Sequence, residues 1–445
     1  TLMLKSPSSN SDQKLAWKED GSQEEEVKRR FESLVHIGVD EKGKGRDRLK
    51  NELLALRRVL SFQSLGPPAT NQNGDTTFRG QLWKLLLGVL YYDMDPAEDY
   101  LKEVRKGKSK LKCRNGNTAY SAIRDDSFRT MKGSKVFDIT IEEPKLIRVL
   151  NAYVNKSSKP YSQGLNTILV PFLVCMNEMD AFHCFHHLLE EVTPTYWMAY
   201  ERNGYGSRGY YLGARAACRL ADKILVEVDP ELHENLMDSE VVRKLPGNNQ
   251  AEIFHQLYTF RHMHVFTLCA RPLEEVIQLW DLYLALGIHM HVVAYVAQLM
   301  LIRHKLLHED AEINKLLSQD SWPELNSRAV ISLTTYLMAH LPENIVEELE
   351  NHTTDRELCL KLVQWQPEEQ QIFQNSRSRN HSRANVFGSR SRRARSADTL
   401  EPSRAPAGSV SLMVSPGLRT PRARSVIRNR AERRSSAVRQ GCSVS

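Results

Sequence analysis

A helical period in the apolar residues, sustained over most of the chain, constrains the fold more than any other feature. Between residues 78 and 341 apolar side chains recur at intervals of three and four, as in the stretches 146–154, 182–192 and 273–284. Runs of alternating apolar and polar residues bounded by hairpin turns are missing, and connectors such as 157–160 are short. The pattern predicts an all-α fold with about a dozen or more helices.

The two ends of the chain lack this period. Residues 1–27 are rich in Ser, Lys, Glu and Gln, and residues 375–445 hold 16 Arg, 15 Ser, no Lys and three acidic residues, a net charge of +13 in a chain of +7. Such segments cannot bury enough apolar surface to offset their ordering entropy. We predict a disordered N-terminal segment at 1–27, a helical lead-in and linker at 28–77, a helical extension at 346–374 and a disordered basic tail at 375–445.

The sequence gives no sign of a membrane span or of secretion. The longest strictly apolar run, 168–176, has nine residues and contains a proline, whereas a spanning helix needs about 20. The first residues have neither a basic region nor a long apolar one, and the seven cysteines are scattered without a C-x-x-C pair. We therefore expect a cytoplasmic protein with no transmembrane segment.

Two local patterns suggest ligand sites without supporting them. Residues 204–209 fit G-x-G-x-x-G, but the sequence before them reads as a helix rather than the strand that a dinucleotide site requires. His183 and His187 lie four residues apart beside Cys184 and His186, but no H-E-x-x-H motif accompanies them. We expect an inter-helix loop at the first pattern and a partly buried helix edge, without a metal, at the second.

The most informative stretch holds three short phrases. FRGQLWKLL at 78–86 contains Arg79 and Trp83, IRDDSFRT spans 123–130, and YSQGLN spans 161–166. In this order they resemble the R-x-x-x-W, I-x-x-D-x-x-R and Y-x-Q motifs of the TBC domain, the fold of GTPase-activating proteins for Rab-type GTPases. Neither of the last two motifs is specific by itself, but their order and spacing together indicate this family.

The resemblance covers residues 78–345 and includes Leu279-Trp280-Asp281. Within the family the phrases look most similar to the branch of yeast mitotic-exit and septation checkpoint GAPs. The chain departs from the pattern in having Leu165 where Met is usual, which conserves volume, and in carrying extra residues at 255–265, which leaves the alignment of 240–270 open.

The resemblance implies a role for each motif residue. Arg129 would be an arginine finger and Gln163 a glutamine finger that replaces the water-positioning glutamine of the GTPase. Asp126 would restrain the Arg129 guanidinium as its charge partner, and Tyr161 and Asn166 would support the site. Four further residues are expected to be structural, the tryptophans filling helix interfaces and the charged pair satisfying buried backbone groups: Arg79, Trp83, Trp280 and Asp281.

The same residue types suit the chemistry when it is considered alone. GTP hydrolysis passes through a loose transition state whose charge a planar guanidinium can stabilise, while a carboxamide can both accept from water and donate to phosphate. The alternative for Asp126 and Arg129 is an ordinary ion pair on a surface helix, and for Tyr161 and Gln163 an ordinary loop with an anchoring ring.

These features predict a GTPase-activating protein for a Rab-like or Ras-like GTPase, in mitotic-exit or cell-cycle checkpoint control. It would activate the hydrolysis of its partner rather than be a hydrolase itself, and would need no cofactor of its own because Mg²⁺ and GTP come with the GTPase. The resembled branch implies a scaffold subunit and a spindle-pole location.

Other functions stay open at this point. The domain could be a Rab GAP in vesicle traffic, or a non-catalytic TBC scaffold that only binds a GTPase or a partner. An adaptor that binds RNA or membranes through the Arg/Ser tail is a third possibility. The absence of interleaved aromatic residues in the tail argues against sequence-specific nucleic-acid binding.

Overall fold

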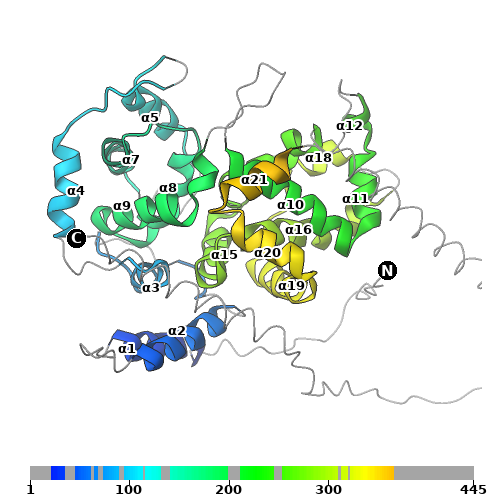
Figure 1. Ribbon diagram of the computed structural model, residues 1–445, viewed down its shortest axis with the longest axis horizontal. Coiled ribbons are helices and arrows are strands. Elements are labelled where there is room, and N and C mark those ends of the chain that lie inside the picture. The colour runs from blue at the N-terminus through cyan, green and yellow to red at the C-terminus, as the bar shows by residue number, and fades with distance from the viewer. Residues whose placement is uncertain are drawn as a thin grey trace, which may run out of the picture. The chain divides into compact units, whose positions relative to one another are not determined.

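The computed structural model describes most of the chain between residues 22 and 364, and its secondary structure is helical (Figure 1). The described ranges are 22–35, 46–61, 65–68, 74–89, 95–113, 116–131, 141–198, 211–244, 253–308, 312–318 and 321–364. They contain no β-strand, only one isolated antiparallel bridge between Lys112 and Thr118. The predicted all-α fold is confirmed.

The chain divides into two units, and the helices of the structure belong to the first, which includes residues 1–363. Its first half consists of eight α-helices, one short π-helix and one 3₁₀-helix in the described residues. These are α1 (Ser22–Val35), α2 (Arg46–Leu60), α3 (Phe78–Leu87), α4 (Pro96–Arg105), α5 (Ala119–Ser127), α7 (Glu143–Ser157), α8 (Leu165–Cys175), α9 (Glu178–His187), the π-helix η1 (Leu188–Val192) and the 3₁₀-helix η2 (Pro194–Trp197).

The second half is built in the same way. It comprises α10 (Leu212–Val228), α11 (Pro230–Met237), α12 (Glu240–Lys244), the π-helix η3 (His255–Thr259), α14 (Phe260–His264), α15 (Leu273–Leu286), α16 (Met290–Leu301), α17 (Arg303–Leu306), α18 (Ile313–Leu316), α19 (Ser327–His340), α20 (Glu343–Asn351) and α21 (Arg356–Val363).

Local sequence explains where several helices begin. The side chains of Thr77, Thr118 and Asn177 accept hydrogen bonds from the first-turn backbone amides of α3, α5 and α9. Proline stands in the first turn of α4 and of α11 and fits there because the missing N–H has no intrahelical partner.

The core is organised around α8 and α10. α8 is apolar on nearly all sides and packs on α7, α9 and α3, while α10 packs on α16, α14 and η2. Phe172 of α8 meets Trp83 of α3 and Trp280 of α15 edge to face, with ring centroids 6.0 and 5.6 Å apart. These rings join α3, α8 and α15.

The ends of the folded region extend beyond the resembled stretch. α1 begins at Ser22, earlier than the start at 28 expected from the apolar period, because its first turn is polar, with Glu24 and Glu25, and the period does not detect it. α20 and α21, in and beside the extension expected at 346–374, pack on α10. Three predictions fall wholly or partly outside the described residues: residues 1–21 of the disordered segment predicted at 1–27, the G-x-G-x-x-G pattern at 204–209, and the basic tail at 375–445.

Candidate functional site

The two predicted catalytic phrases meet where α5 ends and α8 begins. Ile123 is fully buried and fixes the rotation of α5, so that Asp126 one turn later also points inward and is 6% exposed. Arg129 follows in the turn after α5, and its side chain is 65% exposed. An inward carboxylate and an outward guanidinium therefore lie next to each other.

Asp126 holds Arg129 by a direct ion pair. An η nitrogen of Arg129 donates to Asp126 Oδ1, and this hydrogen bond, together with the charge of the carboxylate, raises the pKa of Arg129 further. An exposed i, i+3 pair of this kind contributes little to stability, on the order of a few tenths of a kcal/mol. Its effect is to limit the orientations of the guanidinium while leaving it open to a partner.

The other oxygen of the same carboxylate contacts the second phrase. Tyr161 is 6% exposed, and its hydroxyl donates to Asp126 Oδ2 at 2.9 Å. Burial, then the nearby negative charge of Asp126, raise the pKa of Tyr161 well above its ordinary value, so that the hydroxyl keeps its proton. Asp126 thus bridges Arg129 and the residue two positions before Gln163.

Asn166 makes the second link between the phrases. Its side-chain amide donates to Thr130 Oγ1 at 2.8 Å, and the Thr130 hydroxyl donates to the Asp126 carbonyl at 2.8 Å. The side-chain oxygen of Asn166, Oδ1, accepts from the Gly164 amide at 3.1 Å and lies 3.0 Å from the Tyr161 hydroxyl. Thr130 is a member of the site that the sequence analysis left unassigned, although it stands within the second phrase.

Gln163 lies at the apex of the turn that precedes α8. It is exposed, and none of the described residues forms a hydrogen bond with its carboxamide, while its backbone carbonyl accepts from the Tyr211 hydroxyl at 3.3 Å. Gly164 follows with φ of +103°, a conformation that favours glycine, and starts α8. The turn therefore presents the carboxamide to solvent from a fixed backbone.

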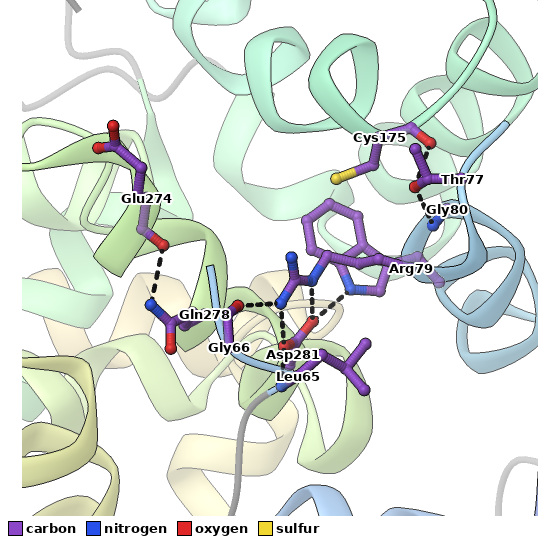
Figure 2. A network of polar contacts seen from close by, with 10 residues as sticks. Leu65, Gly66, Thr77, Arg79, Gly80, Cys175, Glu274, Gln278 and Asp281 are labelled. Carbon is purple, nitrogen blue, oxygen red and sulfur yellow. Dashed lines mark hydrogen bonds and ion pairs between the residues drawn. The ribbon is translucent and has the colours of Figure 1, made fainter. Parts of the chain in front are cut away.

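Three of the four residues expected to be structural, Arg79, Trp83 and Asp281, form a separate, buried network, and Figure 2 shows the contacts of Arg79 and Asp281 within it. Asp281 of α15 is fully buried and accepts two bonds from Arg79 of α3, Nε to Oδ1 at 3.1 Å and Nη2 to Oδ2 at 3.2 Å. Trp83 Nε1 also donates to Oδ1, at 2.8 Å. The pair ties α3 to α15 across 202 positions of sequence.

The same network fixes the connector before α3. The Leu65 amide donates to Asp281 Oδ2 at 3.1 Å, and Arg79 donates to the Gly66 carbonyl at 2.5 Å. Burial disfavours the charge on Arg79, but the charge of Asp281, its hydrogen bonds and other nearby groups together outweigh this and raise the pKa of the guanidinium. Trp280 lies beside the network and donates to the Phe266 carbonyl at 3.3 Å.

The histidines of α9 are part of the packing. His183 Nε2 lies 3.0 Å from the Pro96 carbonyl, and burial lowers the pKa of both His183 and His186, the latter to about 4. Within the described ranges no group of three or more His, Cys, Asp or Glu side chains is placed to hold a metal ion. The expectation that the protein has no cofactor of its own stays a prediction.

Of the helices in the described part of the chain, none is both long enough and apolar enough to cross a membrane.

Comparison with known proteins agrees with the fold and the motifs. The family model of the Rab-GTPase-TBC domain matches residues 76–307. A putative mitotic check point protein BUB2 of Dictyostelium discoideum is 30% identical over 309 residues, 67% of this chain and 74% of the relative. Cell division control protein 16 of Schizosaccharomyces pombe is 26% identical over 69% of this chain and 91% of its own length.

Among solved structures, the Ypt/Rab-GAP domain of Gyp1p is similar with a TM-score of 0.48 and 17% identity, over 70% of this chain and 97% of that domain. The family match covers more than half of the chain and includes all three phrases from which the resemblance was drawn. The chain belongs to the Rab-GTPase-TBC domain family.

Proposed function

We propose that this protein is a GTPase-activating protein that stimulates GTP hydrolysis by a Rab-like or Ras-like small GTPase, with Arg129 and Gln163 supplied in trans. One observation carries the proposal. The buried carboxylate of Asp126 holds the exposed Arg129 with one oxygen and, through Tyr161, the turn of the exposed Gln163 with the other. Two solvent-facing groups are thus held by one buried anchor.

Both groups suit the reaction. The guanidinium of Arg129 carries a permanent charge and planar donors, which can stabilise the charge that develops on the transferred phosphoryl group. The carboxamide of Gln163 can accept from the attacking water and donate to a phosphate oxygen. Since neither side chain is buried, both can enter the nucleotide site of a docked GTPase, which brings its own Mg²⁺ and GTP.

The surface beside Arg129 suits protein docking. Phe128, directly before it, is 63% exposed, the largest exposure of any large hydrophobic side chain among the described residues. Exposed aromatic and arginine side chains are the types that most often anchor protein interfaces. We assign Phe128 to the contact with the GTPase.

The test is single-turnover GTP hydrolysis with a panel of purified Rab-like and mitotic-exit GTPases. The expected result is stimulation of at least one GTPase, most of which is abolished in both Arg129→Ala and Gln163→Ala. If the wild-type protein binds a GTP-loaded partner but both variants stimulate it as well as the wild type does, the finger assignment is wrong. Binding without any stimulation would instead support a non-catalytic scaffold.

The names of the two relatives point to the cell cycle, one a putative mitotic check point protein and the other a cell division control protein. On this ground we propose that the activity serves mitotic checkpoint control. The resemblance to the mitotic-exit branch adds the proposal of a cytoplasmic protein at the spindle pole that works with a scaffold subunit. Preference for a vesicle-traffic Rab in the panel would replace this setting with the alternative one and leave the chemistry unchanged.

A further inference from the structure

Four ring side chains from the second half of the domain and η2 pack behind the Gln163 turn. We call Trp197, Tyr211, Phe260 and His264 the ring cluster. His264 is its centre, with ring centroids 4.1 Å from Tyr211, 5.4 Å from Phe260 and 5.6 Å from Trp197. The Phe260 and His264 rings are stacked, at an interplanar angle of 14°.

The ring cluster touches the turn at Gly164. A Cβ atom added to Gly164 would lie 2.5 Å from His264 Cε1 and 2.9 Å from His264 Nε2, closer than non-bonded atoms approach. The backbone of the turn therefore rests directly on the imidazole ring. Because Gly164 also has a positive φ, any other residue here would be strained twice.

Tyr211 makes the polar contact with the same turn. Its hydroxyl donates to the Gln163 carbonyl at 3.3 Å, and its own backbone is left-handed, with φ of +64°, at the N-terminal end of α10. A bulky residue in this conformation is uncommon and strained. The strained backbone therefore belongs to Tyr211, the residue whose hydroxyl contacts Gln163.

His264 acts by its shape. Its Nε2 is buried and has no hydrogen-bond partner among the described residues, and burial lowers its pKa to about 4, so the ring is neutral at pH 7. It supplies a flat, uncharged surface rather than a charge. A ring without nitrogen atoms should support Gly164 about equally well.

We propose that Tyr211 and His264 are positioning residues that, through the Gln163 carbonyl and Gly164, set the direction in which the Gln163 carboxamide projects. The inference rests on the proposed function of Gln163. Asn166 holds the turn from the side of α8, and the ring cluster holds it from the side of α10 and α14. The turn is thus held from both sides, although only Asn166 belongs to the phrase.

The consequence for catalysis is a matter of alignment. A reacting group displaced by about 1 Å can lose on the order of 100-fold in rate. Loosening the turn should therefore lower kcat for stimulated hydrolysis, while KM for the GTPase, which depends on the docking surface, changes little. Arg129 is held by Asp126 and should be unaffected.

The central experiment is a double-mutant cycle. Tyr211→Phe removes only the hydroxyl and should lower kcat about 10-fold or more, with KM within twofold. In a Gln163→Ala background the same change should have almost no further effect, because there is no carboxamide left to aim. Tyr336→Phe, an exposed tyrosine of α19, is the matched control and should leave kcat unchanged.

The ring is tested by two substitutions of His264. His264→Phe should keep most of the activity, whereas His264→Ala should lower kcat as Tyr211→Phe does. Hydrogen exchange of the Gly164 amide provides a measurement independent of GTPase stimulation. It should become faster in Tyr211→Phe and in His264→Ala, but not in Tyr336→Phe.

The outcomes separate this inference from the proposed function. If Arg129→Ala and Gln163→Ala both keep full stimulation, the proposed function fails and the positioning role with it. If Arg129→Ala and Gln163→Ala lose activity but Tyr211→Phe does not, the inference alone is overturned. Equal losses from Tyr211→Phe in both backgrounds would show a general structural role and would also overturn it.

Discussion

Two aspartates of this domain, Asp126 and Asp281, each join an arginine to an aromatic side chain, with opposite results. Asp281 and Arg79 are both buried, and every one of their contacts named above is internal. Asp126 is equally inaccessible, but its partner Arg129 is 65% exposed. The chemistry is the same, so burial of the guanidinium decides whether the pair holds helices together or presents a charge to a partner.

The difference extends to what each pair satisfies. Asp281 and Arg79 also bind the backbone of Leu65 and Gly66, so their loss would leave several buried polar groups without partners. Arg129 has Asp126 as its ion-pair partner, and its outer donors remain available. Removing Arg129 should therefore change function without changing stability, and removing Asp281 should do the reverse.

The Arg129→Ala substitution should have the largest effect of all, on the rate of stimulated GTP hydrolysis. An arginine finger is worth about 10³–10⁵ in rate, equivalent to about 4–7 kcal/mol of transition-state stabilisation. Arg129→Lys should fail as well, because an ammonium lacks the planar set of donors. Single-turnover hydrolysis measures the loss, and thermal unfolding should give nearly the wild-type melting temperature.

Arg124→Ala is the matched control for this change. Arg124 is an exposed arginine on the same helix, α5, but outside the Asp126 pair. A loss of activity in Arg124→Ala as large as that in Arg129→Ala would mean that general positive charge, rather than a finger, drives the stimulation.

Asp281→Asn should have the largest effect on stability. Loss of the carboxylate leaves the Arg79 charge buried without its counterion, and breaking such a pair typically costs about 3–5 kcal/mol. Denaturant unfolding should show the midpoint moving to a much lower concentration, while the exposed control Asp238→Asn stays near wild type. Equal unfolding midpoints for the two variants would show that the buried network does not stabilise the fold.

Lowering the pH should destabilise the buried interior while leaving the charge of the candidate site unchanged. His291 and His352 are fully buried around the Tyr196 hydroxyl, and burial lowers their pKa values to about 3 and about 4. In the unfolded chain both would titrate near 6.5, so their stabilising effect is complete above that pH and is lost as the pH falls toward 4.

We therefore expect the free energy of unfolding to fall by on the order of 1–2 kcal/mol per histidine between pH 7 and pH 5. Arg129 stays charged over this range. Unfolding curves at several pH values, with the double variant His291→Gln/His352→Gln for comparison, measure the effect. A wild-type protein whose stability is flat over this range would exclude a contribution from these histidines.

Tyr161→Phe should have a smaller effect, and it should lower both the stability of the fold and the rate of stimulated hydrolysis. It removes one buried hydroxyl and leaves Asp126 Oδ2 without that donor, at a cost of about 1–3 kcal/mol in stability. The restraint on Arg129 through Oδ1 remains, so we expect the loss in kcat to be about 10-fold, well below that of Arg129→Ala. A kcat as low as that of Arg129→Ala would make Tyr161 a direct participant.

The sequence predicts the local part of this picture well and the long-range part poorly. The helical period predicts the all-α fold, and Asp126 and Arg129 can be paired from their spacing alone. That Asp281 binds Arg79 could not be predicted, because the two are 202 positions apart and meet only after α3 packs on α15. The charges of two residues and their spacing in the sequence do not show whether they form a buried ion pair.

Tyr211 illustrates the same limit at the candidate site. The G-x-G-x-x-G pattern just before it, at 204–209, does not point to the Gln163 turn. The left-handed backbone of Tyr211 and its contact with Gln163 arise from the packing of α10 behind the turn. The glycine of the third phrase was the one available signal, since Gly164 directly after Gln163 indicates a turn with little space around it.

Removing the basic tail should have the smallest effect on the Asp126 and Asp281 networks. Truncation after Gln374 should leave the melting temperature and the Arg129-dependent rate in solution almost unchanged, because a segment without apolar periodicity adds no core. It should weaken binding to anionic vesicles, where each arginine near the surface is worth up to about 1 kcal/mol. Glutamate at Ser396, Ser425 and Ser436 should reproduce part of that loss by offsetting part of the +13 charge. Co-sedimentation with phosphatidylserine vesicles at two salt concentrations measures it, and a truncated protein that unfolds earlier would show that the tail supports the domain after all.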